Sequence, residues 1–304
     1  PEKKRAIIGH MFFVVTEKAA KALNLDFDHA FLGQGTLRPD LIESGNPDVS
    51  GYAKKIKTHH NDVGVIRALR DKGHVIETNW DWHKDEVRQV ARMLGLDEAI
   101  ASRQPFPGLG VRILCIDGGV RPNAEYQAEL DKYNTESGNK YEMKVAPVQS
   151  VGVQGDHRSY RSLAIMAKSG LDVNWNQLRD DAKQIPNHLN FINRTAYLIN
   201  RDEIGGEMIS KRCRICHETA ELLREVDDIV TSELMVPMNG KPSKIAQCFA
   251  VLVPASVGGD KYSIAIRAVV TTDFMTAQSA VPGVDFPQDA LKNIVERIGK
   301  NPVA

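Results

Sequence analysis

Apolar residues return every three or four positions along several stretches of the chain. This spacing covers Ile7–Leu23, Asp85–Leu94, Leu223–Val230 and Leu291–Ile298. It is the period of a helix that buries one face, so four helices are predicted there. Tyr262–Val270 alternates apolar and other positions instead, which is the period of a strand. The chain therefore mixes both kinds of element.

The first third of the chain alternates short helical and strand-like segments. A helix at Val65–Leu69 is predicted to stop at Gly73. Strands are predicted at His74–Glu77 and Val111–Ile116, on either side of the helix that ends at Leu94. Such alternation is typical of an α/β domain built on a parallel sheet.

The second half of the chain contains two similar strand–turn–strand segments, residues 145–167 and 249–270. Each carries a proline late in its first strand, a Gly-Asp turn and a tyrosine that begins the return strand: Pro147, Gly155-Asp156 and Tyr160 in one, Pro254, Gly259-Asp260 and Tyr262 in the other. We interpret the pair as an internal duplication of a small α+β unit.

These patterns divide the chain into two domains. Residues 1–116 form the first domain, and the polar stretch 117–144 is predicted to be a linker or a peripheral hairpin. Residues 145–304 form the second, with repeats at about 145–200 and 245–304. A length of 304 residues agrees with two domains.

Composition excludes several classes of protein. Lys plus Arg and Asp plus Glu both number 39, so no overall basic field is available to hold nucleic acid or an anionic membrane. No apolar run approaches the ~20 residues that a membrane span needs, and the N-terminal stretch lacks the features of a signal peptide. Four cysteines in a chain of this size favour a reducing compartment, which we expect to be the cytoplasm.

Two polar stretches are the strongest candidates for chemistry. Phe31–Ser44 places Gly33 and Gly35 on either side of a glutamine, followed by a hydroxyl, a cation and two carboxylates, and Ile56–Asp62 adds a lysine, two histidines and an amide. Glycines let backbone N–H groups approach a phosphate closely. On the residues alone, ordinary polar surface loops are the favoured interpretation of both stretches.

The order of the motifs resembles one family. The chain is similar to GMP synthase, first to its synthetase part and then to its dimerisation domain, in the larger variety of that enzyme. The segments that carry the resemblance are LGQGTLRPDLIES, IKTHHND, HKDEVR, RQPFPGLGVRIL, SVGVQGDHRSY and TTDFMTA. The fold that this implies is a partial parallel-sheet, adenine-nucleotide α-hydrolase-like (ATP-pyrophosphatase) domain, followed by an α+β dimerisation domain with an internal duplication.

The resemblance implies a two-step amination. The family transfers AMP from ATP to an oxygen of XMP, and ammonia supplied from glutamine by a glutaminase domain then displaces AMP to give GMP. Such a site needs a phosphate cradle, Mg²⁺ and exclusion of water. The partners implied are therefore XMP, a glutaminase domain in the same or a separate chain, and a second copy in a homodimer.

The resemblance also assigns roles to residues. A mobile lid would bring catalytic groups to the nucleotide, with Lys57 as a point charge on phosphate: Lys57, His59, His60 and Asn61. The glycine loop would hold ATP and Mg²⁺, with Asp40 as the metal ligand: Gln34, Gly35, Thr36 and Asp40. XMP would be bound by Arg158, Gln247, Pro107 and Gly108, with Arg158 on the 5′-phosphate.

Departures from the family pattern set an alternative beside this assignment. The SGGVDS signature of the pyrophosphate loop, the glutaminase triad and the closing KPPGTIEWE-like segment are not in the sequence, so the polypeptide by itself is expected not to adenylate XMP. The alternative is a non-catalytic nucleotide-binding or assembly protein with the same fold. For Arg158, the competing interpretation is a surface pair with Asp156 worth ~0.5 kcal/mol.

One rival motif points to a different class of protein. Cys213-Arg-Ile-Cys216-His217 fits the attachment pattern of a c-type haem. That chemistry requires export, and no signal sequence or second set of zinc ligands accompanies the pair. We expect two reduced cysteines.

Overall fold

The structure, a computed structural model, describes residues 2–25, 29–43, 69–105, 107–154, 157–238, 240, 243–271 and 277–301. Residues 2, 42–43, 153–154 and 157–158 are described by their backbone only. The chain divides into two compact units, one over residues 1–103 together with the segment that ends at Arg158, and one over residues 104–154 and 159–304.

The first unit is mainly helical around one short parallel strand pair. Its elements are α1 (Glu2–Ala22), β1 (Leu32–Gly33), α2 (Arg38–Glu43), β2 (Val75–Ile76), α4 (Lys84–Met93) and α5 (Glu98–Ala101). Strands β1 and β2 run parallel, with Leu32 opposite Val75. The helix predicted for Ile7–Leu23 forms as α1, but the prediction that it buries one apolar face is wrong within this structure, because Met11, Phe12 and Val15 are 49%, 65% and 57% exposed. The strand predicted for His74–Glu77 is confirmed by β2.

The end of the predicted helix before Gly73 is also confirmed, because Gly73 has a φ of 76° and its N–H donates to the Arg70 carbonyl. Most of Val65–Leu69 lies outside the described residues. Helix α4 is where the sequence predicts it, but none of its residues is fully buried, and Leu94 of the predicted buried stripe is 74% exposed. The reason is positional: Leu94 is the C-cap, one residue past the last turn.

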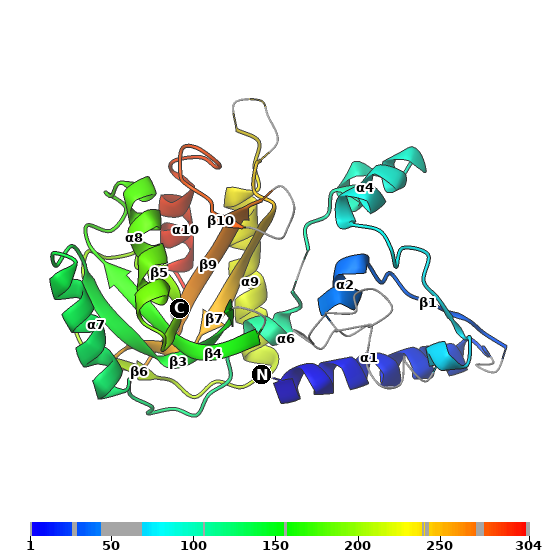
Figure 1. Cartoon of the computed structure of the whole chain (residues 1–304), viewed down its shortest axis with the longest axis horizontal. Helices are drawn as coiled ribbons and strands as arrows, with labels where there is room; N and C mark the ends of the chain where they lie inside the picture. The colour runs from blue at the N-terminus through cyan, green and yellow to red at the C-terminus, as the bar shows by residue number, and fades with distance from the viewer. Residues whose placement is uncertain are drawn as a thin grey trace. The chain divides into compact units, whose positions relative to one another are not determined.

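The second unit contains three small sheets and most of the apolar core. Its elements follow in chain order: α6 (Leu109–Arg112), α7 (Ala124–Glu136), β3 (Glu142–Gln154), β4 (His157–Ala167), α8 (Trp175–His188), β5 (Ile192–Tyr197), β6 (Met208–Ser210), α9 (His217–Leu234), β7 (Gln247–Val253), β8 (Ala255–Val257), β9 (Ser263–Val270), β10 (Gln278–Ser279) and α10 (Ala290–Ile298). The sheet orders are β3-β4-β5, β10-β9-β7 and β6-β8 (Figure 1). The molecule is therefore a mixed α/β protein with several small sheets.

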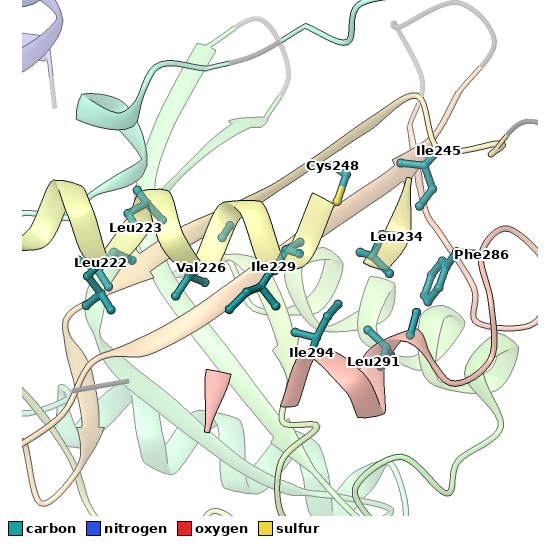
Figure 2. Packing of buried hydrophobic residues seen from close by; sticks show 14 of the residues in the cluster. Leu222, Leu223, Val226, Ile229, Leu234, Ile245, Cys248, Phe286, Leu291 and Ile294 are labelled. Atoms are coloured by element: carbon teal, nitrogen blue, oxygen red, sulfur yellow. The ribbon is translucent and has the colours of Figure 1, made fainter. Parts of the chain in front are cut away.

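Three apolar clusters show how this unit is layered. The first lies between the β10-β9-β7 sheet and helices α9 and α10, where Leu223 and Ile294 are almost fully buried (Figure 2). The second joins the β3-β4-β5 sheet to α7 and α8. The third lies between the two sheets and includes Leu163 and Val253. The order of layers is thus helix, sheet, sheet, helix.

The buried stripes predicted for the last two helices are confirmed. In α9 the side chains of Leu223, Val226, Ile229 and Val230 are all buried, and in α10 those of Leu291 and Ile294 are buried while Ile298 packs against the same cluster. The alternation predicted for Tyr262–Val270 is confirmed by β9, because Tyr262, Ile264, Ile266 and Ala268 all pack on the α9–α10 side. Side chains of one parity along a strand share one face.

Two local predictions are wrong. The strand predicted for Val111–Ile116 is instead the single turn α6, and the residues after it contribute only two isolated bridges, Ile113 to Leu252 and Ile116 to Cys213. A short apolar run does not distinguish a buried strand from a buried helical turn. The stretch 117–144 is not a linker or hairpin, since it contains α7, whose Leu130 is fully buried.

Helix α7 forms where only polar character was recognised. Asn123 caps it by accepting hydrogen bonds from the N–H groups of Glu125 and Tyr126, at 2.8 and 3.3 Å. Tyr126, Leu130 and Tyr133, spaced at four and three residues, then face the second cluster.

Within the part of the chain that the structure describes, the helices are all too short or too polar to span a bilayer.

Candidate functional site

The glycine loop lies at the carboxyl ends of the two parallel strands of the first unit. Gln34 follows β1 directly, and its N–H donates to the Ile76 carbonyl at 2.9 Å. Glu77 follows β2 in the same way. Ligands of parallel α/β sheets bind in this position, beyond the carboxyl ends of the strands. The backbone thus places the candidate nucleotide loop at the expected edge of the strand pair.

A buried hydrogen-bond network fixes the middle of this loop. Thr36 is 1% exposed, and its hydroxyl donates to Glu77 Oε1 at 2.6 Å. Arg70 holds the same carboxylate with two bonds, Nε to Oε2 at 2.8 Å and Nη2 to Oε1 at 2.9 Å. The fork-shaped pair is the strong geometry for an arginine and a carboxylate. The Thr36 hydroxyl thus fixes the position of the loop through its hydrogen bond to Glu77.

Replacement of Thr36 tests this positioning role. Thr36→Val is expected to destabilise the loop by about 1–3 kcal/mol, because a buried carboxylate oxygen loses its hydroxyl donor. Amide exchange at Leu32 and Gln34, both hydrogen-bonded to the β2 strand, should become about tenfold faster or more. Thr36→Ser keeps the hydroxyl and should restore protection. Equal exchange in the valine and serine variants would show that the hydroxyl contributes nothing.

Asp40 and Lys84 bring opposite charges together beside the loop. Asp40 Oδ2 accepts a hydrogen bond from the Leu37 N–H at 3.0 Å. Burial and the nearby charge of Arg88 lower the pKa of Lys84, while the carboxylate of Asp40 raises it. Lys84 was not among the candidate residues singled out from the sequence. The sequence did contain one indication of a role for Lys84, because it lies in HKDEVR, one of the motifs that carry the family resemblance.

The donor set near the loop fits Mg²⁺ only in its phosphate-dependent mode. Across the described residues there is no group of three or more His, Cys, Asp or Glu arranged around one metal position. Mg²⁺ in nucleotide enzymes is commonly held by one or two carboxylates together with the phosphates of the substrate. Asp40 as a single carboxylate ligand is consistent with that mode. Gly35 has open space around it, as a close approach of phosphate to the backbone requires.

The second unit brings Gln247 together with the Pro-rich segment. Gln247, at the start of β7, donates through Nε2 to the Pro105 carbonyl at 2.7 Å. One residue on, the Cys248 N–H donates to Gln104 Oε1 at 2.6 Å. Two reciprocal amide contacts thus anchor the chain just before Pro107 and Gly108. Gly108 is the N-cap of α6, so both candidate XMP residues of this segment stand at the entry of that turn.

A buried ion pair joins α6 to α9 and to β7, the strand that carries Gln247. Arg112 of α6 donates through Nη1 to Asp227 of α9 at 2.5 Å and to the Ala250 carbonyl at 3.0 Å. The same Asp227 oxygen accepts the Ala250 N–H at 2.8 Å. The side chain of Arg112 is 2% exposed. The pair therefore joins α6 and α9 to β7, the strand that begins with Gln247.

The remaining candidates cannot be placed with side-chain detail. Lys57, His59, His60 and Asn61 lie outside the described residues, and Arg158 is described by its backbone only, within β4. The cysteines of the haem-like motif occupy structural positions: Cys213 is buried, while Cys216 is the N-cap of α9. Burial raises the pKa of the Cys248 thiol to about 12, so this neighbour of Gln247 is a protonated core residue.

Comparison with known proteins agrees with the motif order. Residues 235–303 match the family model described as GMP synthase C terminal domain. The glutamine-hydrolyzing GMP synthase of Dictyostelium discoideum is 35% identical over 98% of this chain and 47% of its own length. A probable GMP synthase of Caenorhabditis elegans is 32% identical over 99% of this chain and 49% of its length. One from Leptospira interrogans is 36% identical over 91% and 45%.

The chain spans about half the length of the relatives it matches. The match nevertheless runs through both units, from the glycine loop to the last helix, since it includes 98% of the chain. The resemblance carried by the motifs is confirmed: the chain is similar over almost its whole length to GMP synthases, and its residues 235–303 match the C-terminal domain of that family.

Proposed function

We propose that this chain is the synthetase and dimerisation part of a GMP synthase, which converts XMP to GMP through an adenylyl-XMP intermediate. The observation that carries the proposal is similarity to GMP synthases over 98% of the chain. Position supports it as well, because the glycine loop follows a parallel strand where nucleotides bind in α/β proteins. ATP and Mg²⁺ are the cofactors, and ammonia comes from glutamine through a glutaminase domain.

In the first unit the proposed roles follow from charge and position. Gln34, Gly35 and Thr36 border ATP, with Thr36 acting through Glu77 to fix the loop. Asp40 would hold Mg²⁺, which neutralises charge on the leaving pyrophosphate. Lys84, beside Asp40, adds a positive charge for phosphate oxygens. The lid residues, Lys57, His59, His60 and Asn61, would complete the site and exclude water from the adenylated intermediate.

XMP is the ligand proposed for the dimerisation part of the chain. Arg158 would bind its 5′-phosphate through a planar guanidinium. Gln247 and the segment at Pro107 and Gly108 would contact the nucleotide from one side. The contacts of Gln247 with Pro105, and of Gln104 with Cys248, support this by holding the segment in one position. A positioned, rigid wall reduces the ordering cost of binding.

Two further parts of the proposal concern architecture. Residues 1–116 would belong to the ATP-pyrophosphatase domain and residues 145–304 to a dimerisation domain that pairs with a second copy. The two strand–turn–strand segments, β3–β4 and β7–β9, would be the repeats of a duplicated unit. Both segments lie in sheets that pack face to face through the third cluster, as two copies of one unit would.

Titration with nucleotides tests the function directly. The chain is expected to bind XMP more tightly than IMP, which lacks the oxygen that becomes adenylated. Because its 304 residues contain no SGGVDS loop, the polypeptide is expected to form no GMP from XMP, ATP and ammonium. Equal affinity for XMP and IMP, or no binding of either, would favour a non-catalytic assembly protein. GMP formation would contradict the expected inactivity of the isolated chain.

A further inference from the structure

A recess of about 220 Å³ lies at one end of the second cluster. Its walls come from the end of α7, the residues that lead into β3, and α8, and they include Tyr133, Asn134, Lys140, Tyr141, Met143 and Asp181. Met143 belongs to the second cluster and the two tyrosines pack against it, so one wall is apolar and aromatic. Sites for drug-sized molecules occupy about 300–1,000 Å³, so this recess suits a smaller ligand.

Asp181 organises the polar wall of the recess. Its Oδ1 accepts hydrogen bonds from Lys140 Nζ at 3.2 Å and from Gln177 Nε2 at 3.0 Å, and its Oδ2 accepts one from the Tyr141 hydroxyl at 2.9 Å. Burial and this carboxylate raise the pKa of Tyr141, so its hydroxyl remains a donor toward Asp181. The side chains of Lys140 and Asp181 are 48% and 19% exposed, which leaves both charges accessible to a small molecule.

Asn134 adds to the lining an acceptor that lacks a donor. Its Nδ2 donates to the Tyr141 carbonyl at 2.8 Å, which fixes the orientation of the amide. Its Oδ1 is buried and has no hydrogen-bond partner within the part of the chain that the structure describes. A buried acceptor is costly unless a donor from water or from a ligand completes its hydrogen bond. An N–H group of a ligand would supply that bond.

We propose that this recess binds a free amino acid through its ammonium and carboxylate groups. The ligand carboxylate pairs with Lys140, whose ammonium has three N–H donors and uses one of them on Asp181. The ligand ammonium also has three donors, and its acceptors are Asp181, the Tyr141 hydroxyl oxygen and Asn134 Oδ1. A carboxylate accepts about four hydrogen bonds, so Asp181 keeps a position for the ligand. Because the Lys140–Asp181 pair is neutral as a whole, a zwitterion matches both of its charges.

The walls of the recess narrow the ligand class further. The Tyr133 ring, whose centroid lies 5.4 Å from that of His188, supplies a flat surface for the side chain of the amino acid. The charge of Asp181 repels a phosphate dianion, so nucleotides are poor ligands here. The recess lies on the α7–α8 side of the β3-β4-β5 sheet, whereas Gln247 belongs to the other sheet. The amino-acid site is therefore a further site, beyond the nucleotide binding proposed above.

Titration calorimetry of the full chain, free of nucleotides, with L-serine, L-leucine and L-asparagine tests the site. At least one of the three is expected to bind with a dissociation constant in the millimolar range or tighter. For the tightest of them, the amide that lacks the carboxylate and the acid that lacks the amino group are each expected to bind about tenfold more weakly. Absence of binding by all three amino acids would overturn the proposal, and so would analogues that bind as tightly as the amino acid. Because no nucleotide is present, the result does not depend on whether the chain binds XMP.

Substitutions in the lining distinguish ligand binding from a structural role of the same residues. Lys140→Gln is expected to weaken binding of that amino acid about tenfold, and Tyr141→Phe about fivefold, since each removes one hydrogen-bonding group from the recess. Lys132→Gln makes the same change of charge at an exposed position of α7 outside the recess, so it should leave the affinity unchanged. A purely structural role predicts lower melting temperatures for Lys140→Gln and Tyr141→Phe with unchanged affinity, and that outcome would contradict the site.

Discussion

Asp227→Ala is expected to destabilise the second unit by about 3–5 kcal/mol, because it removes one half of a buried ion pair. Arg112 would remain in the core with 2% of its side chain exposed but without that carboxylate. The Ala250 N–H would also lose its acceptor in the middle of β7. Both losses act where α6, α9 and β7 meet, so the packing of all three elements should become less stable.

Amide exchange along β9, which pairs with β7 from Ser263 to Val269, measures this loss away from the mutated contact. Asp228→Ala is the matched control, since Asp228 is an exposed carboxylate one residue along the same helix. It should change stability by at most about 0.5 kcal/mol. The pair Arg112→Met with Asp227→Leu should recover much of the stability, because two apolar side chains need no partner. A small effect of Asp227→Ala alone would mean that water already solvates the pair.

Helices α9 and α10 were predictable because their buried positions repeat regularly. The buried stripe of α9 consists of Leu223, Val226, Ile229 and Val230. Their spacing of three and four residues indicates a helix and no other element. The single turn α6 had no such repeat, and its apolar run was interpreted as a strand. In the structure, Arg112 of this turn contacts Asp227, which lies 115 positions farther along the chain. The spacing of apolar residues along the chain gives no information about so distant a partner.

The same limit applies to the candidate sites. The glycine loop was recognisable from local composition, and the structure places it after β1. The anchoring of the Pro-rich segment by Gln247 joins residues 142 positions apart, and that role is visible only in the fold.

Arg158→Ala is expected to weaken XMP binding about a hundredfold, since a guanidinium that donates two bonds to a phosphate contributes two charged hydrogen bonds. Arg158 lies in β4 within GDHRSY, the motif to which the family resemblance assigns the phosphate. Arg158→Lys keeps the charge but not the planar fork, so an intermediate affinity is expected. Calorimetric titration of XMP into each variant provides the measurement.

Arg161 supplies the control for this result. It lies three residues farther along β4 and lines an open pocket of about 290 Å³ with Tyr126 and Phe191. Arg161→Ala makes the same change in net charge on the same strand, so it should leave XMP affinity within about twofold. If both alanine variants weaken XMP binding equally, the effect comes from the general positive charge of β4. If neither does, Arg158 pairs within its own turn, and the phosphate of XMP must be held elsewhere.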